Sequence, residues 1–163
     1  MEETVNLNNA LAATVGKITP LLKACAKANV KLSKAAFVPE LAKALDPEQT
    51  GILNHLKRIK LLTKLIGKPK NSTPLLGLNP VKLSKTKSTA QDIELVGYAL
   101  ELLAIQNAQL TLLLKLLAAT ALPQASELIS QCIQENKETH IWITRTLDGL
   151  IQQIPTDTSK GSS

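Results

Sequence analysis

Aromatic residues are almost missing from this chain, whose 163 residues include one Phe, one Trp and one Tyr. Strands of β-sandwiches and barrels are rich in aromatic and β-branched side chains, so this scarcity argues against those folds. The hydrophobic residues make up 44% of the chain and are almost all Leu, Ile, Val and Ala. This length and composition predict one all-helical domain around one core.

Cysteine is also scarce, with two residues in the chain. Cys25 and Cys132 lie far apart in the sequence, form no Cys-x-x-Cys pair and have apolar neighbours. We therefore expect two reduced thiols in the core and no nucleophile among them. The sequence also lacks a nucleophile elbow, a phosphate-binding loop and a dinucleotide fingerprint, which favours a non-enzymatic role.

The sequence offers little support for export or membrane insertion. Met1-Glu2-Glu3-Thr4 is acidic and polar where a secretory signal is basic and then apolar, so a cytoplasmic location is expected. The segment 99–122 resembles a membrane span, but Glu101, Lys115 and several amide side chains interrupt it. Lipid would leave those groups unpaired, so we interpret the segment as a bundle helix without a membrane partner.

Acidic residues are missing from the segment 57–87, although the whole chain has a net charge of +6. This segment holds nine basic residues, namely Lys57, Arg58, Lys60, Lys64, Lys68, Lys70, Lys82, Lys85 and Lys87. A run of lysines is often only a solvated face. It can also bind an anionic partner: an acidic protein surface, the acidic C-terminal half of a second copy, or the phosphate backbone of a nucleic acid. The solvated face and the anion-binding surface both stay open as interpretations.

Four helices are predicted from apolar periodicity and from residues that start or end helices. Their expected spans are Asn8 or Asn9 to about Asn29, Pro39 to Gly67, Ser88 to about Thr120, and Pro123 to a residue before Pro155. Pro20 is expected to kink the first helix or to mark its true start. The sequence Asp46-Pro47-Glu48-Gln49 has the form of a capping box, which predicts a bend in the second helix.

These elements predict an antiparallel four-helix bundle over residues 1–155, ferritin-like or an up-down variant, followed by a polar tail over 156–163. The segment 67–87 is expected to be the longer crossover between the second and third helices. The fourth helix has an apolar stripe of Ile129, Cys132, Ile133, Ile143, Leu147, Leu150, Ile151 and Ile154. Asn136 and His140 are predicted to fall inside this stripe.

Several short motifs are similar to those of one ferritin-like family. In the first half these are Pro39-Glu40-Leu41, Leu56, Arg58-Ile59, Leu65-Ile66-Gly67-Lys68-Pro69 and Gly77-Leu78. In the second half they are Glu94-Leu95-Val96-Gly97-Tyr98 and Ile133-Gln134-Glu135-Asn136, with His140 and Ile143. Over about residues 20–152 the chain resembles the family that includes the YciE and YciF stress proteins. The resemblance implies an antiparallel four-helix bundle, usually dimeric, with a carboxylate and histidine metal site in members that retain it.

The residues aligned with the family's ligands depart from its pattern. Glu94 and Glu135 are the main acidic matches, while Leu22 stands at the position of a ligand Glu in the first helix. A di-iron bundle needs Glu-x-x-His on each of two helices, and no such motif occurs in this sequence. We therefore expect the di-iron site to be lost. A reduced site of Glu48, Glu94 and His140, with or without Glu135, could hold one zinc or iron ion.

The leading hypothesis is a non-enzymatic ferritin-like bundle without a cofactor, acting by association as a homodimer through an apolar helix face, in a stress-related or structural role. Under this hypothesis His140 is a core histidine beside Asn136, and Glu94 stabilises its helix start through its charge. The first alternative is a metal-binding or redox stress protein that uses the reduced site. The second is non-specific anion or nucleic-acid backbone binding by the basic residues of the segment 57–87.

Overall fold

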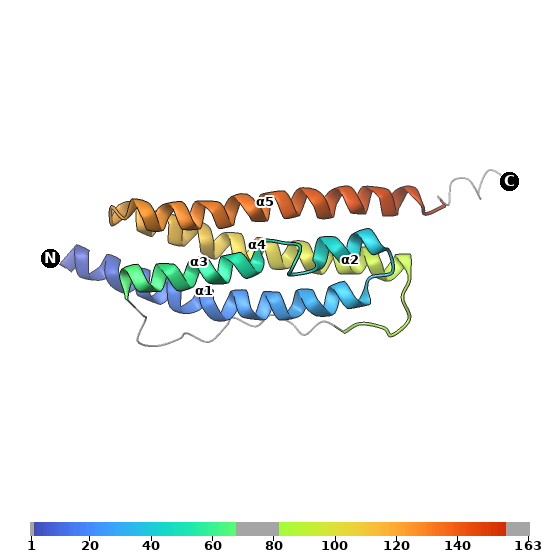
Figure 1. The fold of residues 1–163 in the computed structure, drawn as a ribbon, viewed down its shortest axis with the longest axis horizontal. Coiled ribbons are helices and arrows are strands. Elements are labelled where there is room, and N and C mark those ends of the chain that lie inside the picture. The colour runs from blue at the N-terminus through green and yellow to red at the C-terminus, as the bar shows by residue number, and fades with distance from the viewer. Residues whose placement is uncertain (1, 68–81, 156–163) are drawn as a thin grey trace.

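A computed structural model gives the structure of residues 2–67 and 82–155 (Figure 1). Over these residues the chain forms five helices and no strand. They are α1 (Glu2–Ala35), α2 (Pro39–Leu45), α3 (Ile52–Ile66), α4 (Thr89–Ala119) and α5 (Pro123–Gln152). The all-helical prediction is confirmed, and the third and fourth predicted helices agree closely with α4 and α5. The crossover predicted over 67–87 lies mostly outside the described residues, as does the predicted tail.

The first two helices differ from their predicted spans. α1 begins at Glu2 and ends at Ala35 with Pro20 inside it, so Pro20 neither starts nor ends the helix. A proline removes one backbone hydrogen bond, and the buried apolar face of α1 keeps the helix continuous through it. The predicted second helix is interrupted between Leu45 and Ile52, which makes it two helices.

The interruption follows from Asp46 and Pro47. A residue before proline is disfavoured in the helical region, and Asp46 has an extended backbone with ψ 122°. Its Oδ1 accepts a hydrogen bond from the Glu48 N–H at 3.0 Å, and its carbonyl accepts one from the Thr50 N–H at 3.0 Å. Asp46 therefore organises a turn, and α3 begins only after Gly51. The bend predicted at this position is therefore a full interruption, which divides the predicted second helix into α2 and α3.

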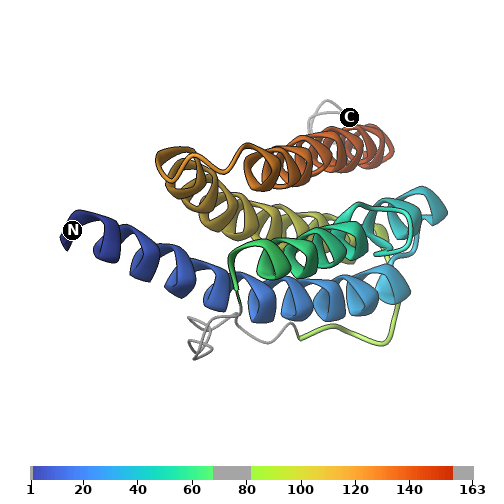
Figure 2. The ribbon, with the colours of Figure 1, turned by 60° about the vertical axis from the view of Figure 1, so that its left-hand side comes forward.

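Neighbouring helices in the bundle run in opposite directions. α1 packs against α4 and against α2 and α3, and α5 packs against the same three helices. Figures 1 and 2 show α1 and α5 running one way and α2, α3 and α4 running the other way. α3 ends at one end of the molecule, whereas α4 begins at the opposite end (Figure 1).

The core consists of two apolar clusters arranged along the bundle. The α2 cluster is formed mainly by α2 and the halves of α1, α4 and α5 beside it, and includes Leu32, Leu45, Leu95, Leu103 and Ile143. The α3 cluster is formed by α3 and the other halves, and includes Ile18, Ile59, Leu113, Cys132 and Ile129. Both predicted core thiols, Cys25 and Cys132, are free and buried, as expected.

A buried carboxylate at the start of α4 fixes the connection between α1 and α2. Asp92 is fully buried, and its two oxygens accept hydrogen bonds from the N–H groups of Phe37 at 2.8 Å and Val38 at 3.0 Å. These groups precede α2, whose own N-cap residue has no capping side chain. Ser88 caps α4 as predicted, because its hydroxyl accepts the Gln91 N–H at 3.1 Å.

Replacing Asp92 by Ala is expected to lower the free energy of unfolding by about 2–4 kcal/mol, because two backbone donors lose a charged acceptor in a buried place. Urea unfolding at neutral pH measures this change. Glu94→Ala is the matched control, since Glu94 is an exposed acid on the same helix and should change stability by less than about 0.5 kcal/mol. Equal losses in the two variants would contradict the role assigned to Asp92.

Candidate functional site

Three polar side chains interrupt the core where its two clusters meet, and we call His55, Gln106 and Asn136 the polar layer. Each lies on a different helix. Along that helix, an apolar residue of one cluster comes before the polar residue, and an apolar residue of the other cluster comes after it. These flanking residues are Ile52 and Ile59 on α3, Leu103 and Leu110 on α4, and Cys132 and Ile143 on α5. The layer therefore crosses the bundle near its middle.

Amide side chains connect α4 to α5 inside this layer. The Asn136 amide donates to Gln106 Oε1 at 3.3 Å and to Asn107 Oδ1 at 3.0 Å. Burial raises the pKa of the Cys25 thiol on α1 to about 11, and the nearby Gln106 amide opposes that rise. The layer thus joins α4 to α5 through amide hydrogen bonds that an apolar environment strengthens, whereas Gln106 Nε2 has no hydrogen-bond partner among the described residues.

An ion pair connects α3 to α5 next to the layer. The Arg58 guanidinium donates to both oxygens of Glu135, with Nη2 at 2.7 Å from Oε2 and Nη1 at 2.9 Å from Oε1. Such two-point pairing is the strongest form of this interaction. Arg58 Nη1 also lies 4.0 Å from the Cys132 thiol. Burial raises the pKa of Cys132 to about 11, so this thiol stays protonated and unreactive at neutral pH.

His55 is fully buried, with its Nε2 3.9 Å from Glu135 Oε1. Burial lowers its pKa to about 4, the Glu135 carboxylate opposes this change, and the Arg58 charge adds to it. The imidazole is therefore neutral at pH 7. His55 was not among the predicted site residues, although its position three residues after Ile52 and four before Ile59 places it on the apolar face of the helix.

The lack of a side chain at Gly51 leaves room for the His55 imidazole and the Glu135 carboxylate beside the start of α3. A Cβ atom at this position would lie 2.5 Å from Glu135 Oε1, 2.9 Å from His55 Nε2 and 3.0 Å from Glu135 Cβ. The carboxylate is held by Arg58 and the imidazole is enclosed, so neither can move away easily. Gly51 has a negative φ of −80°, which means that space and not backbone conformation requires glycine here.

The four residues proposed for a reduced metal site lie in different environments. Glu48, Glu94 and His140 are exposed, while Glu135 is half-buried and paired with Arg58. Across the two described ranges, no three His, Cys, Asp or Glu side chains are grouped as metal ligands would be. The prediction that His140 belongs to the buried stripe was wrong. The step of four and then three residues from Cys132 through Asn136 leads to Thr139, which is buried instead.

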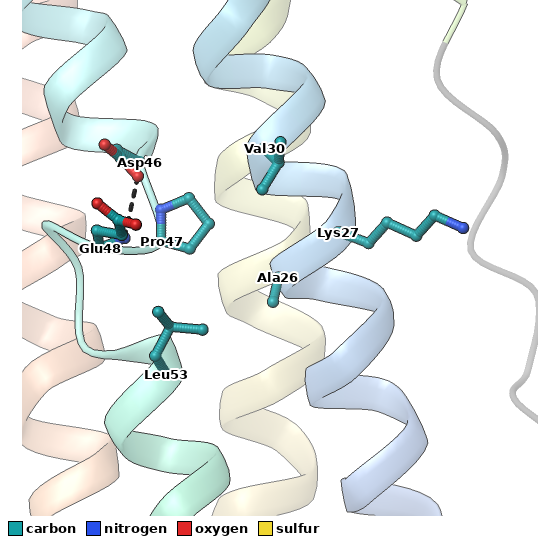
Figure 3. A pocket seen from close by; sticks show the side chains of 7 residues that line it. All are labelled: Ala26, Lys27, Val30, Asp46, Pro47, Glu48 and Leu53. Atoms are coloured by element: carbon teal, nitrogen blue, oxygen red, sulfur yellow. Dashed lines mark hydrogen bonds between the residues drawn. The ribbon is translucent and has the colours of Figure 1, made fainter.

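Glu48 lines an open groove of about 430 Å³ between α1 and the turn after α2. Its walls are Ala26, Lys27, Val30, Asp46, Pro47, Glu48 and Leu53 (Figure 3). Figure 3 shows the Lys27 side chain directed away from the two carboxylates, so charged groups do not converge on one point. The groove offers an apolar wall and two acids, without the set of convergent polar groups that a ligand site requires.

The basic residues of the segment 57–87 are divided between separate places. Lys57, Lys60 and Lys64 are exposed on α3, and Lys82, Lys85 and Lys87 are exposed before α4. The end of α3 and the start of α4 lie at opposite ends of the molecule (Figure 1). Arg58 points to Glu135 and not to solvent with the lysines. Lys68 and Lys70 lie outside the described residues.

α4 has an exposed side that is largely apolar, which we call the outer face of α4. It consists of Gly97, Glu101, Ala104, Ile105, Ala108, Thr111, Leu112, Lys115, Ala118 and Ala119. An 18-residue window of α4 has a mean hydropathy of 1.5, and 33% of that window is buried in the protein. By length and composition α4 could cross a membrane, and it is the one such helix within the described residues. An apolar helix that is buried on one side only leaves its other side for another surface.

Comparison with known proteins gives no assignment, since no family model matches the chain and no curated protein matches it either. The ferritin-like resemblance therefore rests on the short motifs quoted above. The polar layer and the outer face of α4 are the two features from which a function can be inferred.

Gly51→Ala is expected to lower the free energy of unfolding by about 1–3 kcal/mol, because the added methyl group forces His55 or Glu135 from its place. Gly149→Ala on α5 is the matched control, since nothing lies within 4 Å of a Cβ there and alanine favours a helix by up to about 1 kcal/mol. Chemical unfolding of both variants gives the comparison. Stabilisation by both substitutions would refute the close approach at Gly51.

The lowered pKa of His55 makes stability depend on pH. Because its pKa is about 4 in the folded protein and 6.5 ordinarily, the unfolded chain binds the proton more readily. Stability from neutral His55 is fully present above pH 6.5 and is lost as the pH falls towards 4, by about 3 kcal/mol in total.

Urea unfolding between pH 7 and pH 4 tests this dependence. Because carboxylates also titrate in that range, the decline in stability of each variant is compared with that of the wild type. His55→Leu should show a smaller decline than the wild type, and His140→Gln should show the wild-type decline because its imidazole is exposed. Parallel curves for the wild type and His55→Leu would contradict the assignment.

Proposed function

We propose that this chain is a ferritin-like four-helix bundle that acts by self-association instead of catalysis, with the outer face of α4 as its association surface. The helix arrangement supports the bundle. α2 and α3 follow one another between α1 and α5, so the five helices can be described as filling four positions. Neighbours are antiparallel and α3 and α4 are at opposite corners, which fits a bundle with one long crossover.

The interior supports a non-enzymatic role. Leu22 is packed in the core where the resemblance implies a ligand Glu. Glu135 already binds Arg58 through both carboxylate oxygens, and the nearby His55 is neutral and enclosed. A carboxylate neutralised by a guanidinium and a histidine with a pKa of about 4 are poorly suited to acid–base work at neutral pH. The polar layer is better explained as a device that aligns the helices.

The outer face of α4 is the observation that carries the association. Along a helix of 31 residues, its solvent side is made mostly of Ala, Ile and Leu. An apolar strip of this length costs free energy in water unless another surface covers it. The described helices do not cover it, because its residues are exposed in the structure while α1 and α5 pack against α4. A second protein surface is therefore the expected cover.

Leu112→Lys is expected to weaken self-association at least about tenfold, because it places a charge in an apolar contact. Sedimentation equilibrium between about 1 and 100 µM measures the masses. Leu65→Lys on α3 is the matched control, since Leu65 is 52% exposed and Leu112 is 48% exposed. The wild type and Leu65→Lys should form the same oligomer. A monomeric wild type, or equal behaviour of the two variants, would contradict the proposal.

A further inference from the structure

The exposed residues of α4 recur at steps of three and four along the helix. One line of them consists of Gly97, Glu101, Ala104, Ala108, Thr111, Lys115 and Ala118, with Ile105 and Leu112 beside it. Steps of this size keep side chains on one side of a helix. Most members of the line are Gly or Ala, whose small side chains let a second helix come as close as about 8 Å between axes. The line has the composition of a helix–helix contact.

The charges on this line are arranged symmetrically. Glu101 and Lys115 are the two charged residues nearest its centre, and each lies seven residues from Ala108. At 1.5 Å per residue, each of these two charges is about 10 Å from Ala108 along the helix. Neither has an ion-pair partner among the residues that the structure describes. Glu94, also exposed and one step before Gly97, lies fourteen residues from Ala108. Around Ala108 the face thus carries one negative and one positive group, equally far from this small central residue.

Direction decides what these charges meet in a second copy. In a parallel pair, Glu101 would lie opposite Glu101 and Lys115 opposite Lys115, and both contacts would be repulsive. In an antiparallel pair centred on Ala108, each Glu101 lies opposite the partner's Lys115. The same register puts the small Ala104 opposite the partner's larger Leu112. Charge and size are therefore complementary in one arrangement and opposed in the other.

We infer that the outer face of α4 binds a second copy of this chain in antiparallel orientation, with a two-fold axis at Ala108 and with Glu101 of each copy opposite the partner's Lys115. This pairing rests on the proposed self-association and adds to it a direction and a register. Because the two copies use the same patch, the contact closes on itself and gives a dimer instead of an open chain.

A lipid bilayer could also cover an apolar helix face, but the positions of Glu101 and Lys115 disfavour it. Glu101 and Lys115 lie on the same exposed side as Ala108, about 21 Å apart along the helix. A bilayer would have to accommodate both charges near its apolar region, at a cost of a few kcal/mol each. A second copy neutralises each with the opposite charge. Contact with lipid gains nothing from placing Glu101 and Lys115 at equal distances from Ala108.

Cysteine cross-linking tests the register. Ala108→Cys should form a disulfide-linked dimer on mild oxidation with copper phenanthroline, because residues on a two-fold axis approach one another. Ala118→Cys is the matched control on the same line. In the antiparallel dimer its two copies are about 30 Å apart, so it should cross-link at least about tenfold more slowly. Cys25 and Cys132 are buried with pKa values of about 11 and contribute little background.

Charge reversal tests the pairing independently of oxidation. Glu101→Lys and Lys115→Glu should each raise the dimer Kd about tenfold by creating two repulsive contacts, and the double variant should return it to within about twofold of the wild type. Glu94→Lys is the control, since Glu94 lies outside the central contact. Sedimentation equilibrium gives all of these constants. Equal cross-linking of Ala108→Cys and Ala118→Cys, or failure of the double variant to recover, would overturn the inference.

The outcomes separate this inference from the proposed function. If Leu112→Lys disrupts the oligomer but Ala108→Cys does not cross-link faster than Ala118→Cys, self-association stands and the antiparallel register is refuted. If the wild type is monomeric and floats with vesicles of phosphatidylcholine and phosphatidylglycerol, both are refuted in favour of a lipid cover. A monomer that does not float refutes both as well.

Discussion

The polar layer is the constraint on which the arrangement of the helices depends. His55, Gln106 and Asn136 lie between two apolar clusters. The Asn136 amide reaches its acceptors, Gln106 and Asn107, only if α4 and α5 keep their relative position along the bundle, while neither nitrogen of His55 has a hydrogen-bond partner among the described residues. Sliding one helix by a turn, about 5.4 Å, would bury an amide or imidazole among leucines. Apolar packing alone tolerates such shifts, because one leucine can replace another. The layer therefore selects one alignment from many that the leucine-rich core would accept.

Once this alignment is fixed, the ion pair and Gly51 follow from it. Arg58 is one turn beyond His55 on α3, and Glu135 precedes Asn136 on α5, so the layer brings the guanidinium to the carboxylate. The interruption between α2 and α3 then has a structural use. In a continuous helix from Pro39 to Gly67, residues 46–51 would follow the helical path. The turn at Asp46 instead lets Gly51 lie against Glu135 and His55. The interruption between α2 and α3 and the Arg58–Glu135 ion pair therefore depend on each other, because both place Glu135 beside Gly51.

Sequence reasoning succeeded where a signal was local. Ser88 before α4, Pro123 at the start of α5 and the burial of both thiols follow from single residues and their neighbours. It failed where tertiary contacts decide. Pro20 was expected to kink the first helix or to mark its start, and α1 begins eighteen residues earlier because packing carries the helix through the proline. At Asp46-Pro47 a bend was expected, and the structure has a complete interruption there. His140 was predicted to lie in the apolar stripe four residues after Asn136, but the buried residue is Thr139, three residues after Asn136. Pairings such as Arg58 with Glu135 join residues far apart in sequence and have no local signal at all.

The distribution of charge is consistent with a contact through α4. α4 packs against α1 and α5 and lies opposite α2 and α3, so the exposed lysines of α3 lie on the far side of the molecule from the outer face of α4. The chain has a net charge of +6, and two copies repel each other unless their basic regions stay apart. If the two copies meet through α4, their α3 helices lie on the two outer sides of the pair. The α3 lysines of one copy are then farther from those of the other than the roughly 8–10 Å over which charges act in physiological salt. A contact through α3 would bring the same lysines together. The apolar surface of α4 is thus also one that keeps the lysines of α3 apart, although the hydrophobic pattern and the charge pattern arise from different residues.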